Sequence, residues 1–361
     1  MQKNKSNPRT ARLCFVGDIM PGRKISRALR ANPGHDIWGR AQSLLVSCDG
    51  VIANLESPIT EHGGRWREGM KAFRFAAIPE IGPALKDANI SALTLANNHI
   101  LDHEETGLRD TIELLDKLGI NHCGAGKNLE EAWQPAWFQA GDACVLMISF
   151  TDNMPEFAAQ PGKGGTAFMR VGEEPHQLAL IEALIRNERR NGADCIILSL
   201  HWGINLRPGP SKRFRRFARQ MISLGVDIVH GHSAHLLHGI ELYQGGVILY
   251  DTGDFLDDYW IFPGIRTDRG GAFIIDLERG KPHRIEFHPI KQQRLATDLA
   301  EGAEAERILE LVQRKSAALG TPLQRSGQKL VANVGGAWTT ASSGDLFRLP
   351  PGASVLREDS K

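Results

Sequence analysis

The chain has few cysteines, and their spacing indicates neither a disulfide framework nor a thiolate metal site. Its 361 residues include five cysteines, an odd number, and none of them forms a C-x-x-C pair. Cys14, Cys144 and Cys195 fall within apolar stretches, which is typical of buried thiols in a reducing compartment. We therefore expect a cytoplasmic protein without disulfides or a zinc–cysteine site.

Long apolar segments and an excess of one charge sign are also absent. No stretch approaches the roughly 18 apolar residues of a membrane-spanning helix. The polar residues 1–11 are expected to form a disordered tail rather than a signal peptide. The 43 Lys and Arg balance the 42 Asp and Glu, for a formal net charge of +1. Charge therefore gives no indication of a nucleic-acid partner, no membrane span is predicted, and the oligomeric state is left open.

Strand-like and helix-like segments alternate along most of the chain. Apolar runs predict strands at 13–16, 51–55, 90–95, 144–150, 195–200 and 226–229. Helical spacing predicts helices at 24–31, 79–89, 104–118, 175–191, 212–224 and 301–319. Runs at 247–250, 272–277 and 284–288 have little helix between them, so we expect antiparallel strands there. The pattern is typical of a layered α/β fold. We expect one domain at 12–290 and a C-terminal helix with an irregular extension, an appendix to the core, at 291–361.

Five of these runs lead into side chains that can bind a metal. These residues are Asp18, Glu56, Asn98 with His99, His201, and the pair His232 and His235. Open α/β sheets bind ligands beyond the carboxyl ends of their strands, so the residues are predicted to share one rim. Oxygen and imidazole ligands suit Mn, Fe or Zn. The sequence thus predicts a site for one or two divalent metal ions per chain.

The segment from Val229 to His235 is the most specific of these motifs. Two histidines three residues apart, just past a strand, can hold adjacent metals or one metal from two sides. His230 and His238 could also contribute. For Asp18 a helix-capping role is the alternative, and for Glu56 it is an exposed strand end.

A further motif runs from Asn97 to Asp102. The oxygen of Asn98 could bind a metal while His99 stays free as an acid, and Asp102 could hold the His99 tautomer through a hydrogen bond. The alternative is a turn followed by a capping aspartate. After a later strand, Asp251 or Asp254 could orient imidazole rings or simply form a turn.

Taken in order, these motifs resemble the CapA family, which is named for a poly-γ-glutamate capsule biosynthesis protein. That family belongs to the calcineurin-like metallophosphoesterase superfamily. The resemblance covers roughly residues 12–260 and rests on the segments 16–18, 53–56, 96–102, 201–203 and 231–235. It implies a four-layer α/β/β/α sandwich of metallophosphoesterase type with a dimetal site at one sheet edge.

The resemblance also implies a role for each site residue. Asp18 and His235 would hold one metal, Asn98, His201 and His232 would hold the other, and Glu56 would bridge them. His99 would protonate the leaving group while a metal-activated water attacks.

Three positions depart from the expected pattern. Met20 stands where the superfamily has a histidine ligand, so the first metal site is expected to be weak or empty. Glu56 is longer than the usual bridging aspartate. Asp254 stands where the family pattern has asparagine.

The leading prediction is therefore a CapA-like metal-dependent hydrolase of a phosphoester, peptide or γ-glutamyl amide bond. It would take a small-molecule, peptide or polyanionic substrate and act in poly-γ-glutamate or cell-envelope polymer metabolism. Two alternatives stay open. One is a metal-independent acid–base isomerase or epimerase acting on a peptide. The other is a non-catalytic accessory protein of polymer synthesis that keeps the pocket.

Overall fold

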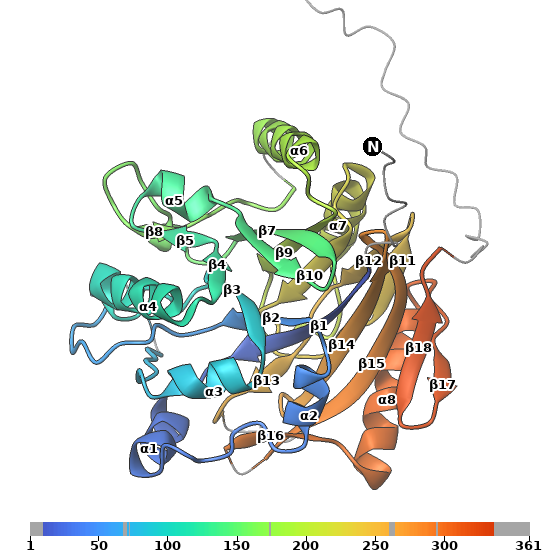
Figure 1. Ribbon diagram of the computed structural model, residues 1–361, viewed down its shortest axis with the longest axis horizontal. Coiled ribbons are helices and arrows are strands. Elements are labelled where there is room, and N and C mark those ends of the chain that lie inside the picture. Colours follow the sequence, from blue (N-terminus) through green and yellow to red (C-terminus); the bar gives the residue numbers. More distant parts are fainter. Residues whose placement is uncertain are drawn as a thin grey trace, which may run out of the picture.

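The computed structural model describes residues 10–67, 71, 73–172, 175–259, 264–293 and 295–335 (Figure 1). The expected tail at residues 1–11 lies outside this part of the chain except for Thr10 and Ala11, which begin strand β1. The end of the chain from residue 336 also lies outside it. Within the described ranges, no helix combines the length and the apolar character needed to cross a membrane.

A large mixed sheet forms one half of the molecule. Its strands follow the order β17-β18-β15-β14-β1-β2-β3-β4, with β13 paired to β1 and β16 to β15. Their bounds are β1 (Thr10–Ile19), β2 (Gly50–Leu55), β3 (Ile90–Thr94), β4 (Asn121–Cys123), β13 (Asp254–Leu256), β14 (Arg269–Glu278), β15 (Lys281–Gln293), β16 (Ala296–Leu299), β17 (Gln324–Ser326) and β18 (Lys329–Asn333). The strands β1 to β4 run parallel, so their carboxyl ends meet at one edge.

A second sheet packs against the first. Its order is β11-β12-β10-β9-β7-β6. The bounds are β6 (Ala136–Ala140), β7 (Ala143–Thr151), β9 (Cys195–His201), β10 (Ile228–His232), β11 (Ile240–Tyr243) and β12 (Gly246–Leu249). A separate short pair joins β5 (Ala125–Gly126) to β8 (Gly165–Thr166). The strands β7, β9, β10 and β12 are parallel, and they also deliver their carboxyl ends to one edge.

Helices cover the outer faces of both sheets, and one further helix packs into the core between them (Figure 1). Their bounds are α1 (Arg23–Ala31), α2 (Ala41–Val46), α3 (Ile81–Asp87), α4 (Glu104–Leu118), α5 (Leu129–Trp133), α6 (Pro175–Arg190), α7 (Lys212–Ser223) and α8 (Gly302–Ala317), with a 3-10 turn η1 at Pro155–Phe157. Helices α1 to α4 share a buried core with the large sheet. Helices α6 and α7 share another with the second sheet.

Strand β1 shows why the sandwich has four layers. Side chains alternate between the two faces of a strand. Leu13 and Phe15 lie in the core between the two sheets, while Cys14 and Val16 lie in the core under the helices. Both faces are therefore buried, and the predicted α/β/β/α order is confirmed.

The C-terminal part contributes to the core between the sheets. Helix α8 inserts Ile308, Leu309 and Val312 into it, and burial of such side chains stabilises a fold by roughly 1.5–3 kcal/mol each. Strand β15 continues past residue 290, where the predicted domain ends, and β18 pairs with this strand. The described part of residues 291–361 is thus built into the sandwich, although the division into domains stays a prediction.

Two strand predictions need correction. The strand expected at 226–229 begins at Ile228 and continues to His232, so His230 and His232 both lie inside the sheet. The segment near Val247 pairs parallel with β10, although it is antiparallel to β11. Periodicity identifies a strand but not its partner, so direction could not be deduced locally.

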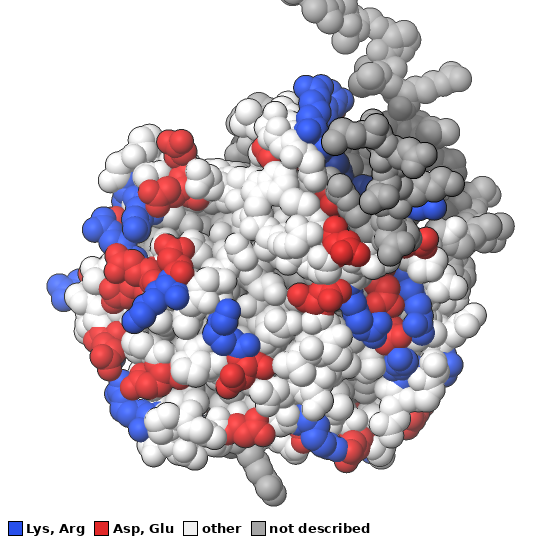
Figure 2. Space-filling model, in the orientation of Figure 1, with Lys and Arg blue, Asp and Glu red and all other residues white. Residues whose placement is uncertain are grey.

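The face of the molecule seen in Figure 2 shows no concentration of one charge. On the face in Figure 2, basic and acidic side chains are interspersed, which agrees with the net charge of +1.

All five cysteines are free, and Cys144 alone among them is only partly buried.

Candidate metal centre

The predicted ligands gather at the carboxyl ends of strands from both sheets. Asp18 and His201 lie near the ends of β1 and β9, and His232 ends β10 opposite His201. Glu56 directly follows β2, and His235 lies in the loop after β10. Each of these five side chains is buried, with His235 the most accessible at 7%. The structure therefore brings together residues that are up to 217 positions apart because parallel strands end at a common edge.

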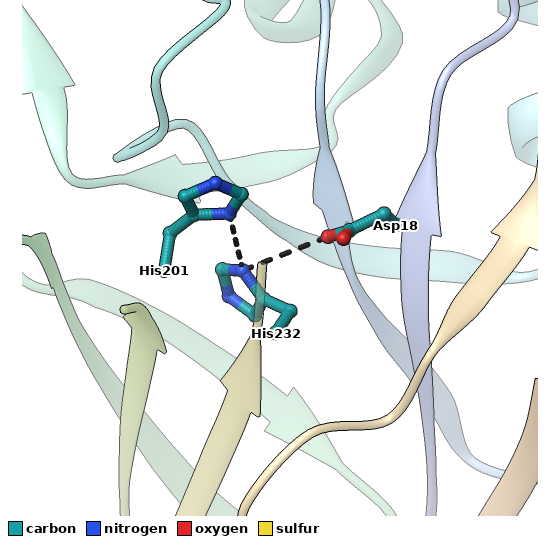
Figure 3. A group of neighbouring side chains, drawn as sticks. All are labelled: Asp18, His201 and His232. Carbon is teal, nitrogen blue, oxygen red and sulfur yellow. Dashed lines mark hydrogen bonds and ion pairs between the residues drawn. The ribbon is translucent and has the colours of Figure 1, made fainter. Parts of the chain in front are cut away.

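One group comprises Asp18, His201 and His232 (Figure 3). Each offers a ligand atom, and these atoms lie within 4.8 Å of one another. The Nδ1 atoms of His201 and His232 are 2.9 Å apart, and Nδ1 of His232 is 3.6 Å from Oδ1 of Asp18. Burial lowers the pKa of both histidines. Their rings are therefore neutral, as metal-binding imidazoles must be.

A second group shares Asp18 and adds Glu56, His235 and Asp254. Nδ1 of His235 lies 2.7 Å from Asp254, 3.5 Å from Asp18 and 3.9 Å from Glu56. Burial raises the pKa of Asp18 to about 7 and, together with the charge of Asp18, raises the pKa of Glu56. Burial disfavours a charged His235, but the surrounding carboxylates outweigh it and raise the pKa of this histidine.

Several oxygens of the candidate ligands lack hydrogen-bond donors. Among the described residues, no donor reaches Oδ2 of Asp18, either oxygen of Glu56, Oδ2 of Asp254 or Oδ1 of Asn98. Burying carboxylates without partners is costly. A divalent cation would satisfy them, and oxygen with imidazole is the donor set that Mn, Fe and Zn accept. The residues present therefore fit a metal centre.

The two asparagines at 97 and 98 have different surroundings. Asn97 donates to Oδ1 of Asn54 at 3.0 Å and to the Leu55 carbonyl at 2.8 Å, and it accepts from the His99 amide. Asn54 in turn donates to Asp18 at 2.7 Å. Asn97 thus fixes the loop, which leaves the side-chain oxygen of Asn98 as the candidate ligand.

His99 and Asp102 form the hydrogen bond that the sequence predicted. Nδ1 of His99 lies 2.6 Å from Oδ2 of Asp102, which also accepts from the Phe75 amide at 2.7 Å. Burial lowers the pKa of His99 to about 4, although Asp102 acts in the opposite direction. With Nδ1 engaged, Nε2 is the ring atom left for proton transfer.

Lys71 is a site residue that the sequence did not reveal. Its amino group contacts Asp102 and the Asn98 carbonyl, and its side chain is 8% exposed. Burial lowers the pKa of Lys71, and Asp102 partly offsets this effect. Lys71 comes from the long segment between β2 and α3, which shows no strand-end pattern that could have indicated it.

Aromatic rings pack against the two most accessible histidines of the candidate centre, His99 and His235. The ring of Phe75 lies 4.5 Å from His99, and that of Tyr259 lies 5.7 Å from His235. The guanidinium of Arg23 sits over both aromatic rings. The sequence did not predict Phe75, Tyr259 or Arg23 as site residues, because isolated residues carry no spacing signal. Met20, at the position of the expected histidine, is fully buried.

A hollow of about 300 Å³ adjoins the loops that follow β7 and β9. Its lining includes Arg207, Arg213 and Asn153. Asn153 donates to Oγ of Ser233 at 3.0 Å, so this hollow touches the loop that carries the histidine pair.

Comparisons with known proteins match this picture. The family model described as bacterial capsule synthesis protein PGA_cap matches residues 12–259. The PGA biosynthesis protein CapA of Bacillus subtilis is 30% identical over 279 residues, which cover 76% of this chain and 70% of that protein. The capsule biosynthesis protein CapA of Bacillus anthracis is 27% identical over 261 residues, covering 71% of this chain and 62% of the relative.

Solved structures show a looser likeness. A 5'-nucleotidase precursor from Thermus thermophilus has 13% identity and a TM-score of 0.45, covering 86% of this chain and 59% of the other.

Proposed function

Because the chain belongs to the bacterial capsule synthesis protein PGA_cap family, we propose that it is a metal-dependent hydrolase in poly-γ-glutamate or cell-envelope polymer metabolism. The bond cleaved would be a peptide or γ-glutamyl amide, or a phosphoester. The names of the two Bacillus relatives connect those proteins with PGA and capsule synthesis, which favours the amide. Every candidate ligand and both candidate catalytic residues lie within the family match at 12–259.

The observation that carries the proposal is the pair of buried groups that share Asp18 and contain unpartnered oxygens. Asp18 would contact both cations, with Glu56 and His235 completing one site and His201, His232 and Asn98 the other. When bound, divalent cations supply Lewis-acid chemistry that activates water and polarises the scissile bond.

Residues of the chain itself would transfer the proton that the leaving group needs. Since burial lowers the pKa of His99 to about 4, its Nε2 carries a lone pair at neutral pH. His99 would therefore accept a proton first and then return it to the leaving group. Asp102 accepts the Nδ1 hydrogen and fixes the tautomer, and the rings of Phe75 and Tyr259 pack against His99 and His235.

An anionic substrate suits the hollow beside the centre. Arg207 and Arg213 lie in its lining, and guanidinium groups bind carboxylates and phosphates well. The hollow also reaches Asn153, which is hydrogen-bonded to Ser233 between the two histidines. A polymer carrying carboxylates would thus be held with one of its bonds near the centre.

The test is a hydrolysis screen with matched variants. Protein stripped of metal is incubated with Mn²⁺, Fe²⁺ or Zn²⁺ and assayed on aryl phosphoesters, a γ-glutamyl anilide and poly-γ-glutamate. We expect turnover that needs added metal and that is lost in H201A. The control is H283A, since the side chain of His283 is 59% exposed and lies outside both groups.

Two results would contradict the proposal. Turnover that persists after metal removal would indicate metal-independent acid–base chemistry. Metal-loaded protein that cleaves none of these substrates would indicate an accessory role in polymer synthesis.

A further inference from the structure

Asp254 lies at the start of β13, directly beside Asp18. The two residues are register partners in the parallel pairing of β13 with β1. Both side chains are buried, with 0% exposure for Asp254 and 1% for Asp18. Strand pairing therefore fixes two carboxyl groups next to each other at the same rim, where their charges repel unless a cation lies between them or one of them is protonated.

The contacts of Asp254 place it among the inner side chains of the centre. Its Oδ1 is 2.7 Å from Nδ1 of His235, and this is the same ring atom that faces Asp18 and Glu56. A residue that only oriented the ring would contact the nitrogen facing away from the carboxylates. No hydrogen-bond donor among the described residues reaches Oδ2 of Asp254.

The two groups consequently differ in chemical character. The group with Asp254 contains three carboxylates and one imidazole, whereas the other contains two imidazoles and one carboxylate. Carboxylate oxygens suit hard cations such as Mn²⁺ and Mg²⁺, while imidazole suits Zn²⁺ and Fe²⁺.

We propose that Asp254 is a metal ligand and that it makes the centre select two different cations. A hard cation such as Mn²⁺ binds at Asp18, Glu56, Asp254 and His235, and a Zn²⁺-type cation binds at Asp18, His201 and His232. This assignment rests on the proposed function, because it presupposes a metal centre.

The neighbouring Asp257 supplies the competing explanation. It is buried and interacts with Asp254, and two buried carboxyl groups can share one proton instead of binding a cation. In that case Asp254 would be neutralised by its neighbour, and its removal would not change metal affinity.

A metal titration separates the two explanations. Metal-free protein is loaded with one equivalent of Zn²⁺ and then titrated with Mn²⁺, with free Mn²⁺ followed by electron paramagnetic resonance. The variant D254N keeps the shape of the side chain and removes its charge, and D254S is a second, smaller replacement. The control is D276N, because Asp276 pairs with Arg12 and lies outside both groups. Thermal unfolding of each metal-free variant verifies that it is folded.

The expected result is that D254N and D254S weaken Mn²⁺ binding at least about tenfold, while Zn²⁺ affinity and the behaviour of D276N stay unchanged. An unchanged Mn²⁺ affinity in the folded variants would overturn the inference and leave the proposed function standing. Equal losses of Mn²⁺ and Zn²⁺ affinity would overturn the assignment of Asp254 to only one of the two metal positions. Wild-type protein that binds neither ion would contradict both this inference and the proposed function.

Discussion

Replacing Glu56 with glutamine is predicted to stabilise the metal-free protein while weakening its response to metal. Glu56 is fully buried, and neither of its carboxylate oxygens has a hydrogen-bond donor among the described residues. The carboxylate also lies in one group with Asp18 and Asp254. A buried charge without compensation costs several kcal/mol, and glutamine removes that charge at nearly constant volume.

The size of the effect depends on protonation. Burial, followed by the charge of Asp18, raises the pKa of Glu56 above its ordinary value of 4.5. The raised pKa keeps a proton on Glu56 of the metal-free protein to higher pH than in the unfolded chain, which avoids part of the cost. We expect E56Q to raise the free energy of unfolding by about 1–3 kcal/mol. Since the folded state binds this proton more tightly than the unfolded chain, wild-type stability falls as the pH rises from 4.5 toward the folded pKa. E56Q lacks this loss, so its free energy of unfolding exceeds that of the wild type by an amount that grows with pH.

The assay is urea unfolding of both proteins across this pH range, with chelator and then with saturating Mn²⁺. At a concentration of 100 times its Kd, a ligand adds about 2.7 kcal/mol. Wild-type protein should gain this amount and E56Q clearly less. The control is E61Q, because Glu61 is 65% exposed and should change stability by no more than about 0.5 kcal/mol. Lower stability of metal-free E56Q at every pH would refute the reasoning, since it would mean that the carboxylate has a structural partner.

Three further predictions concern single residues. H99Q should reduce turnover by about 10²–10⁴-fold without changing the metal content. Kinetics and metal analysis of the same variant test this, and a loss of metal would show that His99 is a ligand. G17A should destabilise the fold by about 1–3 kcal/mol or more in urea, because its Cβ would lie 1.6 Å from the Gly253 carbonyl oxygen; unchanged stability would contradict that close approach. Hydrogen bonding to Arg269 lowers the pKa of Glu304 to about 2 from 4.5, so its stabilisation is present above pH 4.5 and is lost as the pH falls toward 2. E304Q should therefore cost about 1–3 kcal/mol at pH 7, and the difference should shrink in acid. A cost that does not depend on pH would contradict this.

The local sequence predicted most helices and strands and the sheet edge at which the candidate ligands meet. Helix α4 has the predicted bounds, and Gly119 ends it with a left-handed φ of 65°, as a C-terminal glycine should. The convergence of Asp18, His201 and His232 followed from a rule about parallel strands rather than from any local contact. These features could be predicted because each depends on periodicity or on a residue that ends an element.

Tertiary neighbours could not be predicted in the same way. The side chains of α8 pack into one core with residues from strands of both sheets that are distant in sequence. Lys71 reaches Asp102 from the segment between β2 and α3. Asp254 was predicted as a partner of an imidazole or a turn residue, and the structure adds its pairing with Asp18 across β13 and β1.

The central claim is that this rim holds divalent metal, and metal content tests it most directly. Protein purified without chelator or affinity-tag metal is incubated with Mn²⁺, Fe²⁺ and Zn²⁺, desalted and measured by mass spectrometry, beside D18A. Because Asp18 belongs to both groups, the account predicts about two ions per chain in the wild type and loss of most of both in D18A. A wild-type protein that stays free of metal after this incubation would contradict it.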